Sequence, residues 1–129
     1  MNQRFALILD DDVERHLHFR KIFERKGWAY PHVATTVFEA SRRLSTCKYQ
    51  QVFLDHDLGY TDSKATGMSL VQWIVGQVQA GKRRFSGTTF IVHSMNPVGA
   101  QNMVRALTSV GLNVKRIPLV QLYDALRAA

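Results

Sequence analysis

Short apolar runs that are continuous rather than alternating constrain the fold of this 129-residue chain most strongly. A strand with one face in water alternates apolar and polar side chains, whereas a strand covered on both faces is apolar throughout. Residues 5–9, with the sequence FALIL, form the clearest such run. Including one weaker run, the expected strands are at residues 4–9, 28–35, 51–54, 88–92 and 112–117. The pattern predicts a parallel sheet that helices cover on both faces.

A helix-type pattern follows each strand segment. In the third unit, apolar side chains recur at the i, i+3, i+4 and i+7 spacing of one helix face. Further helices are expected after the caps Asp11, Thr36 and Asn96, and a last one from Leu119. The first helix is expected to bury a stripe that consists of Val13, His16, Phe19 and Phe23. Five strand–helix units with short connections predict a single doubly wound α/β domain over residues 1–129.

The expected strand order of such a sheet is 2-1-3-4-5, which makes the first and third strands neighbours at a topological switch point. Ligands of open α/β sheets bind there, outside the carboxyl ends of the strands. The polar residues that follow the strands should therefore gather at one edge. They are Asp10, Asp11, Asp12, Asp55, His56, Asp57, His93 and Ser94, with Lys115 and Arg116 near the end of the fifth strand.

Carboxylates gathered in one place repel each other, and a hard divalent cation is the simplest compensation. Mg²⁺ prefers oxygen ligands and takes one or two carboxylates together with water and phosphate oxygens. Asp11 and Asp55, with a backbone carbonyl near Asp57, suit this pattern, and the choice between Asp10 and Asp11 stays open. Two histidines nearby make Mn²⁺ or another transition metal an alternative.

Each of these residues also has a purely structural interpretation. The acids after the first strand can serve only as helix caps, and Asn96 as the cap of the helix that follows it. His56, His93 and Ser94 can be ordinary loop or strand-end residues. Asp55 is harder to explain without a ligand, because it follows a hydrophobic strand directly.

The formal net charge of +7 comes from 17 lysines and arginines against 10 acids. Because several acids belong to the expected site, the remaining surface is more basic still, which favours a polyanionic partner such as nucleic acid. A basic but unspecialised surface is the alternative. No apolar run has membrane-spanning length, no signal peptide precedes the first strand, and the single cysteine excludes a disulfide framework. We therefore expect a cytoplasmic protein without membrane contact. The sequence leaves the number of subunits undecided.

With these residues in place, the chain resembles the receiver domains of two-component response regulators, which have a CheY-like, flavodoxin-like fold. Residues 9–12 (LDDD) are similar to the segment that carries the receiver acid pair. Asp55 stands where the phosphoacceptor aspartate would be, and Asp57 where a receiver supplies a backbone metal ligand. Ile117 stands where receivers usually carry a lysine. The loss of that lysine argues against phosphotransfer signalling.

These departures resemble a narrower group, the cyclic-phosphate-processing receiver-like domains. Three separated segments carry this resemblance: residues 9–12 (LDDD), 54–59 (LDHDLG) and 93–99 (HSMNPVG), with Gly67 between the last two. The resemblance implies metal-dependent processing of cyclic phosphate ends, on RNA or on nucleotides.

One hypothesis is therefore a metal-dependent phosphoesterase that opens a cyclic phosphate, of the 2′,3′ type found on RNA ends or nucleotides. Imidazole would act as general acid or base, and an Asp55 phosphoenzyme is the covalent variant. The residues expected at the metal are Asp10, Asp11, Asp55 and Asp57; those expected in catalysis are Asp55, His56, His93 and Ser94; those expected on phosphate are Ser94, Asn96, Lys115 and Arg116. The expected metal is Mg²⁺, with Mn²⁺ as the alternative.

The other hypothesis is a receiver-like signalling or binding module. In it, Asp55 would accept a phosphoryl group, or the acidic residues would bind metal as a fixed switch, and a partner would contact the surface around the fourth helix and fifth strand. The missing lysine counts against the phosphorylated form. The basic surface counts against a role that faces proteins alone.

Overall fold

Five parallel strands form one sheet in the computed structural model of the protein, which describes residues 5–59, 62 and 65–129. The strands are β1 (Ala6–Leu9), β2 (His32–Ala34), β3 (Gln51–Leu54), β4 (Thr89–Val92) and β5 (Asn113–Arg116). Their order across the sheet is β2-β1-β3-β4-β5, which confirms the order expected from the sequence. β1 and β3 are therefore neighbours, as a switch point between them requires.

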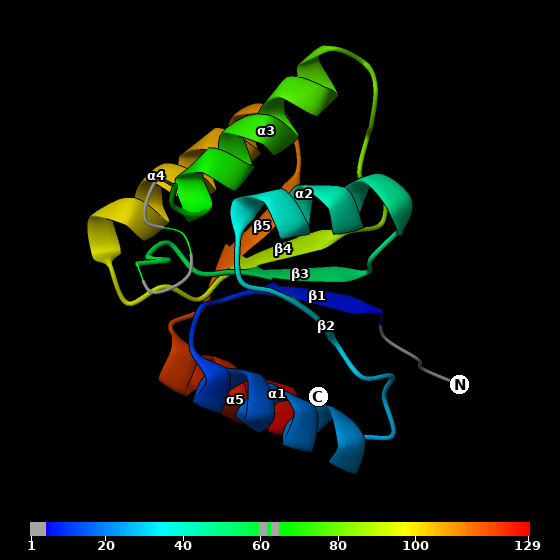
Figure 1. The fold of residues 1–129 in the computed structure, drawn as a ribbon, viewed down its shortest axis with the longest axis vertical. Coiled ribbons are helices and arrows are strands. Elements are labelled where there is room, and N and C mark those ends of the chain that lie inside the picture. Colours follow the sequence, from blue (N-terminus) through cyan, green and yellow to red (C-terminus); the bar gives the residue numbers. More distant parts are fainter. Residues whose placement is uncertain (1–4, 60–61, 63–64) are drawn as a thin grey trace.

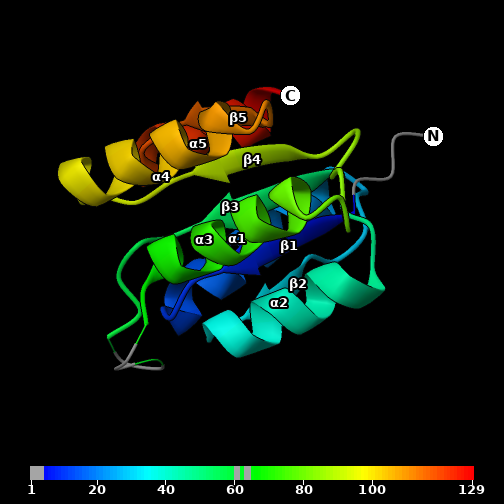
Figure 2. The same cartoon turned by 90° about the horizontal axis from the view of Figure 1, so that it is seen from above.

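Helices cover both faces of this sheet. In the described part of the chain they are α1 (Val13–Arg25), α2 (Val37–Thr46), α3 (Gly67–Gln79), α4 (Pro97–Ser109) and α5 (Leu119–Ala128). α1 and α5 lie on one face, and α2, α3 and α4 lie on the other (Figures 1 and 2). This arrangement confirms the expected doubly wound α/β fold. Within the described residues, no helix is long and apolar enough to cross a membrane.

The three central strands, β1, β3 and β4, are buried on both sides over nearly their whole length, which explains their apolar runs, whereas the edge strand β5 is largely exposed. In β1, Leu7 packs into the core beneath α2, α3 and α4, whereas its neighbour Ile8 packs into the core beneath α1 and α5. On the second side, the ring of Phe53 lies 5.3 Å from that of Phe19 and 6.3 Å from that of Phe23. Aromatic contacts between β3 and α1 therefore hold α1 against the sheet.

The first helix begins one residue later than expected. Its cap is Asp12 rather than Asp11: Oδ1 of Asp12 accepts hydrogen bonds from the amides of Glu14 at 2.9 Å and Arg15 at 3.2 Å. The capping-box expectation was wrong because spacing alone does not show which of three consecutive aspartates takes the cap. Val13 was also misplaced, since it is 66% exposed. The buried residues of α1 are His16, Phe19, Ile22 and Phe23.

The second strand is shorter than expected. Only His32–Ala34 pairs with β1, whereas residues 28–31 connect α1 to it. The amide of Trp28 donates to the carbonyl of Phe23 at 2.9 Å and so closes the end of α1. Pro31 has no amide hydrogen to add to a ladder. The end of α1 and Pro31 therefore restrict the length of this edge strand to three residues, although the apolar pattern suggested a longer one.

The start of α3 approaches the end of β3 so closely that only glycine fits. The amide of Gly67 donates to the carbonyl oxygen of His56 at 2.7 Å. A Cβ atom on Gly67 would collide with the carbonyl oxygen of Asp55, which is backbone and cannot turn aside. Gly67 therefore fixes the path of the chain just beyond the third strand.

We predict that Gly67→Ala lowers the free energy of unfolding by about 3 kcal/mol, because backbone must move to relieve the collision. Urea denaturation followed by circular dichroism measures the change. Gly76→Ala, in the same helix, is the matched control. A Cβ there meets nothing within 4 Å, so alanine should raise stability by up to about 1 kcal/mol. Equal effects at the two positions would contradict the close approach.

Candidate functional site

Three polar residues continue β1, β3 and β4 and lie side by side at the carboxyl edge of the sheet. The last residues of these strands, Leu9, Leu54 and Val92, are register partners. The next residues are Asp10, Asp55 and His93, which are 0%, 5% and 1% exposed. Candidate ligand atoms of the three side chains all lie within 4.8 Å of one another. The structure therefore brings together three of the residues that the strand order predicted to meet.

Asp10 and His93 form a fully buried pair. Nε2 of His93 lies 2.8 Å from Oδ2 of Asp10, and the other carboxylate oxygen accepts the amide of Asp12 at 3.0 Å. Since a carboxylate oxygen accepts, Nε2 donates the hydrogen bond. Nδ1 is buried without a hydrogen-bond partner, and the ring of Phe19 meets the imidazole edge-on. His93 therefore supports Asp10 from inside the domain.

Arg15, in the first turn of α1, lies between two of the carboxylates. Its Nη1 is 3.4 Å from Oδ1 of Asp10 and 3.2 Å from Oδ2 of Asp55. Its Nε is 3.7 Å from Oδ2 of Asp12. The sequence analysis did not single out this arginine. The signal was its position three residues after the cap, because side chains of a helix lean back toward its N-terminus.

His16 was expected only as a member of the buried stripe of α1, but it has a second role. Its Nε2 lies 2.7 Å from the backbone carbonyl oxygen of Asp10. A carbonyl only accepts, so Nε2 donates the hydrogen. The contact satisfies a buried carbonyl at the end of β1 and fixes the backbone from which Asp10 projects.

The pKa values of the two buried carboxyls, Asp10 and Asp55, shift in opposite directions. Burial raises the pKa of Asp55, and the nearby Asp10 carboxylate adds to this, while His93, the His56 amide and Arg15 offset only part of the rise. Burial also acts to raise the pKa of Asp10. There, the hydrogen bond and charge of His93, the Asp12 amide and Arg15 outweigh it, so that the pKa is lowered. Asp10 is thus well compensated, whereas the compensation of Asp55 by Arg15 and its hydrogen bonds is incomplete.

His56 is held by both of its neighbours in the sequence, Asp55 and Asp57. Its amide donates to Oδ1 of Asp55 at 2.8 Å, and its Nδ1 lies 2.7 Å from Oδ1 of Asp57. The Asn96 amide nitrogen lies 3.4 Å from the same Nδ1. Because Nδ1 cannot both donate and accept, we assign its hydrogen to the shorter contact, which leaves the lone pair on Nε2. A Cβ on Gly99 would come within 2.6 Å of this ring, so glycine makes room for it.

Ser94 and Asn96 stabilise the start of α4. The hydroxyl oxygen of Ser94 accepts the amide of Asn96 at 3.0 Å, and Oδ1 of Asn96 accepts the amide of Gly99 at 3.0 Å. These contacts correspond to the structural interpretation given above. They leave the Ser94 hydroxyl hydrogen and the Asn96 amide hydrogens as donors toward a ligand.

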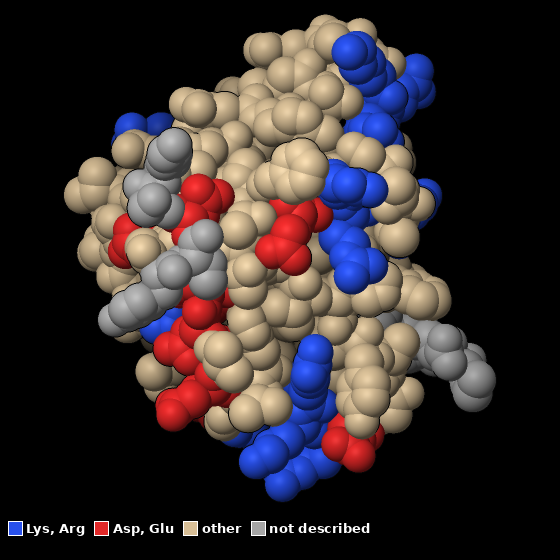
Figure 3. Space-filling view, viewed as in Figure 1, with Lys and Arg blue, Asp and Glu red and all other residues tan. Residues whose placement is uncertain are grey.

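An open hollow of about 780 Å³ lies beside these residues. We call it the acidic hollow. Asp11, Asp12, Asp55 and Asp57 line it, with Arg15 among them and residues 94–97 on another wall. Figure 3 shows acidic side chains gathered on this part of the surface. Asp11 therefore borders the acidic hollow, while Asp10 is enclosed in the domain.

The donor set at the acidic hollow fits a divalent cation. The carboxylate oxygens that line the hollow suit Mg²⁺. The buried group of Asp10, Asp55 and His93 behind them adds an imidazole, a ligand type that also suits Mn²⁺. Among the described residues that line the hollow, Arg15 is the only cationic side chain. One positive charge among four carboxylates leaves the hollow negative, so there is an electrostatic reason to bind a cation.

Lys115 and Arg116 lie elsewhere. Both are exposed on β5. Lys115 lines a separate hollow beside α5, and neither residue lines the acidic hollow. Ile117 packs against the core beneath α1 and α5. The structure therefore does not bring these two basic residues to the other expected site residues.

The fold and the cluster of acids at the switch point define a receiver-like domain. The family model described as the cyclic-phosphate processing receiver domain matches residues 5–109. The chain therefore belongs to this family, which confirms the resemblance noted from the sequence. A comparison with curated proteins found no match.

Solved structures with the same fold include response-regulator receiver domains. The receiver domain of the Francisella response regulator 1452 is 21% identical, with a TM-score of 0.67 over 98% of this chain and 92% of that one. The receiver domain of RcsB from Escherichia coli is 19% identical, with a TM-score of 0.67 over 99% and 90%. The CheY-like receiver domain from Methylobacillus flagellatus is 17% identical, with a TM-score of 0.64 over 98% of both chains. At these identities the likeness shows the fold.

We predict that Asp55→Asn stabilises the metal-free protein at neutral pH by roughly 1 kcal/mol, because it removes an undercompensated buried charge. A carboxyl whose pKa is raised on folding costs stability above that pKa. This cost disappears once the pH falls below the ordinary value of 3.8, since the carboxyl is then protonated in both the folded and the unfolded state. The gain should therefore shrink as the pH falls toward 3.8. Urea denaturation in EDTA measures it, with Asp124→Asn as the exposed control; a loss of stability in Asp55→Asn would oppose the assignment.

We predict that Arg15→Met lowers the free energy of unfolding in EDTA by about 2 kcal/mol, because Asp10 and Asp55 lose their shared cation while the apolar stem remains. Millimolar Mg²⁺ should restore most of the loss, since a bound cation replaces the missing charge. Thermal unfolding with and without Mg²⁺ gives both quantities. Arg15→Lys, which keeps the charge, should lose less. Equal stability of Arg15→Met and the native protein in EDTA would contradict the bridging role.

Proposed function

We propose that the domain hydrolyses a cyclic phosphate, of the 2′,3′ type on RNA ends or nucleotides, with Mg²⁺ or Mn²⁺ at the acidic hollow. The observation that carries this proposal is the buried group of Asp10, Asp55 and His93 beside an open acidic hollow, in a chain of the cyclic-phosphate processing receiver family. The expected location is the cytoplasm.

In this proposal Asp11, Asp55 and the backbone carbonyl of Asp57 hold the cation. When bound, the cation screens phosphate charge and lowers the pKa of a coordinated water. Asp10 does not face the hollow, so its part is to keep His93 and Arg15 in place. Arg15 is 32% exposed and borders the hollow, where its guanidinium can also meet a phosphate oxygen.

His56 is the better of the two candidate histidines for proton transfer. Neither histidine lines the acidic hollow, but His56 stands between Asp55 and Asp57, which do. Its side chain is 18% exposed with the lone pair on Nε2, whereas the His93 side chain is fully buried. Nε2 of His56 takes a proton from the attacking water, whose oxygen bonds to phosphorus. The bond from phosphorus to one ribose oxygen breaks, and the proton passes to that oxygen. His93 is a positioning residue that orients Asp10.

Ser94 and Asn96 are the proposed phosphate ligands. Both line the hollow, and both keep hydrogens to donate after stabilising the start of α4. Lys115 and Arg116 remain candidates only for a longer substrate, because they lie outside the hollow. The N-terminal end of α4 adds a favourable dipole for an anion at this place.

We predict metal-dependent opening of the 2′,3′-cyclic phosphate at the end of a short RNA, followed by phosphorus NMR or by gel mobility. Asp55→Asn and His56→Gln should each lower the rate at least about 100-fold. Asp124→Asn and His18→Gln are matched controls on exposed or partly exposed positions outside the hollow, and they should leave the rate unchanged.

A parallel incubation with acetyl phosphate distinguishes the signalling alternative. Stable label on Asp55 without turnover of the cyclic phosphate would contradict hydrolysis and support a receiver-like module. Absence of both signals would contradict both functions. Turnover that persists in Asp55→Asn would show that the acidic hollow is not the reacting site.

A further inference from the structure

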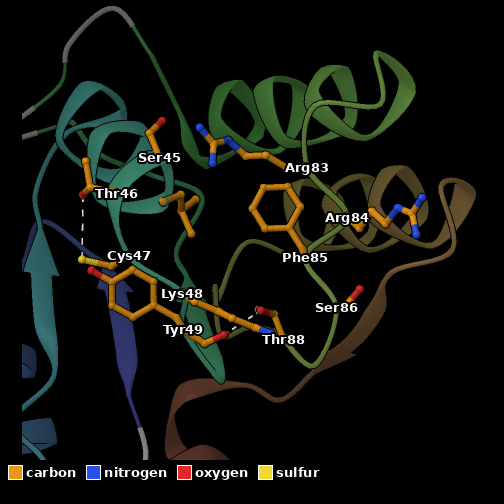
Figure 4. A pocket seen from close by; sticks show the side chains of 11 residues that line it. Ser45, Thr46, Cys47, Lys48, Tyr49, Arg83, Arg84, Phe85, Ser86 and Thr88 are labelled. Carbon is orange, nitrogen blue, oxygen red and sulfur yellow. Dashed lines mark hydrogen bonds between the residues drawn. The ribbon is translucent and has the colours of Figure 1, made fainter.

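A second hollow, of about 410 Å³, lies at the amino ends of the strands, at the edge of the sheet opposite the acidic hollow. The end of α2, the segment that leads into β3 and the connection from α3 to β4 enclose it (Figure 4). Lys48, Arg83 and Arg84 line it together with the rings of Tyr49 and Phe85, and no carboxylate does. Its chemistry is therefore the opposite of the acidic hollow.

The basic character continues along α2. A third hollow of about 350 Å³ adjoins the second, because Thr46 lines both. We call the two together the basic strip. Its cationic side chains are Arg42, Arg43, Lys48, Arg83 and Arg84. One carboxylate, Glu39, also lines the third hollow, and its Oε1 accepts a hydrogen bond from the hydroxyl of Thr35 at 2.8 Å. Among the described residues, none of these five lies within ion-pair distance of a carboxylate. Their charges are therefore available to a partner.

Arg83 gives a more specific indication of an anion. Its Nε is buried and has no hydrogen-bond partner. In Figure 4 its side chain reaches across the hollow toward Ser45 at the end of α2, whereas Arg84 points away. Phe85, two residues on, has a φ of 51°, and its ring packs 5.8 Å from that of Phe90. A residue held in this unusual conformation by packing gives the connection a defined shape.

An exposed aromatic ring lies at the other end of the strip. Phe38 is 69% exposed, and the guanidinium of Arg42 lies 5.8 Å from the centre of its ring. Phe38 and Thr46 are eight positions apart, which corresponds to about 12 Å of helix. A basic groove combined with an aromatic platform is the arrangement that binds single-stranded nucleic acid, through phosphates and stacked bases.

We propose that the basic strip binds a single strand of nucleic acid, with Lys48 and Arg83 on its phosphates and Phe38 stacked on a base. An acidic protein segment would match the charges but has no need of the exposed ring. This inference goes beyond hydrolysis at the acidic hollow and does not depend on it. It gives a place to the polyanionic partner that the net charge of +7 favours.

Fluorescence anisotropy of a labelled oligouridylate of about twelve nucleotides tests the proposal. The oligonucleotide ends in hydroxyls and EDTA is present, so that the acidic hollow is not engaged. Lys48→Ala with Arg83→Ala should weaken binding about tenfold and reduce the salt slope of log affinity by about 1.4, from two phosphate contacts. Phe38→Leu should weaken binding at least about fivefold without changing that slope.

Arg20→Ala with Lys21→Ala is the matched control, because it removes the same charge from exposed positions of α1, on the other face of the sheet. It should change affinity less than about twofold. Equal losses in the two double variants would overturn the proposal and leave only a diffuse charge effect. Equal competition by polyglutamate, or tighter binding of a duplex, would overturn it as well.

Cys47 provides an independent readout of the location. It is the single cysteine of the chain, it is exposed, and it lines the second hollow. Bound oligouridylate should slow its alkylation by a maleimide several-fold in the native protein and in the α1 control variant. Unchanged alkylation at saturating oligonucleotide would place the bound strand elsewhere and overturn the assignment.

Discussion

The guanidinium of Arg15, placed between Asp10 and Asp55, is the interaction on which the acidic edge of the sheet depends. Buried carboxylates so close together are unfavourable unless positive charge or hydrogen bonds compensate them. Asp10 receives both, from Arg15, His93 and the Asp12 amide, and its pKa is lowered. Asp55 receives less, and its pKa is raised. The remaining deficit of positive charge lies at the residue that faces the open hollow, which is where a cation would act.

The sheet order brings these residues together, and this part could be predicted from the sequence. Continuous apolar runs imply a parallel sheet, and the order 2-1-3-4-5 places the ends of β1, β3 and β4 next to one another. Asp10, Asp55 and His93 follow partner residues in register, so their meeting follows from strand ends alone. Backbone periodicity and topology are coarse properties that a pattern of residue types specifies well.

Side-chain direction could not be predicted in the same way. Which aspartate is buried, and that Arg15 rather than Lys115 or Arg116 reaches the carboxylates, depends on the cap of α1 and on rotamers. His93 was expected in catalysis because it is a histidine at a strand end, yet its side chain is enclosed against Asp10 and Phe19. Gly67 and Gly99 matched the family pattern, but the reason for them, room for the Asp55 carbonyl and the His56 ring, is visible only in three dimensions.

The opposite charges of the two edges bear on how one domain would treat a nucleic-acid end. α2 runs from one side toward the other: Thr46 at its end borders the basic hollows, while the amide of Val37 at its start donates to Asp62, in the segment that follows β3, at 3.1 Å. A phosphate is repelled by the carboxylates of the acidic hollow when no cation is bound. Contacts along α2 would supply binding free energy away from this repulsion, and a divalent cation would remove it at the reacting end. If both proposals hold, the strip would set the affinity for the nucleic acid, and the cation would decide whether its terminal phosphate enters the acidic hollow.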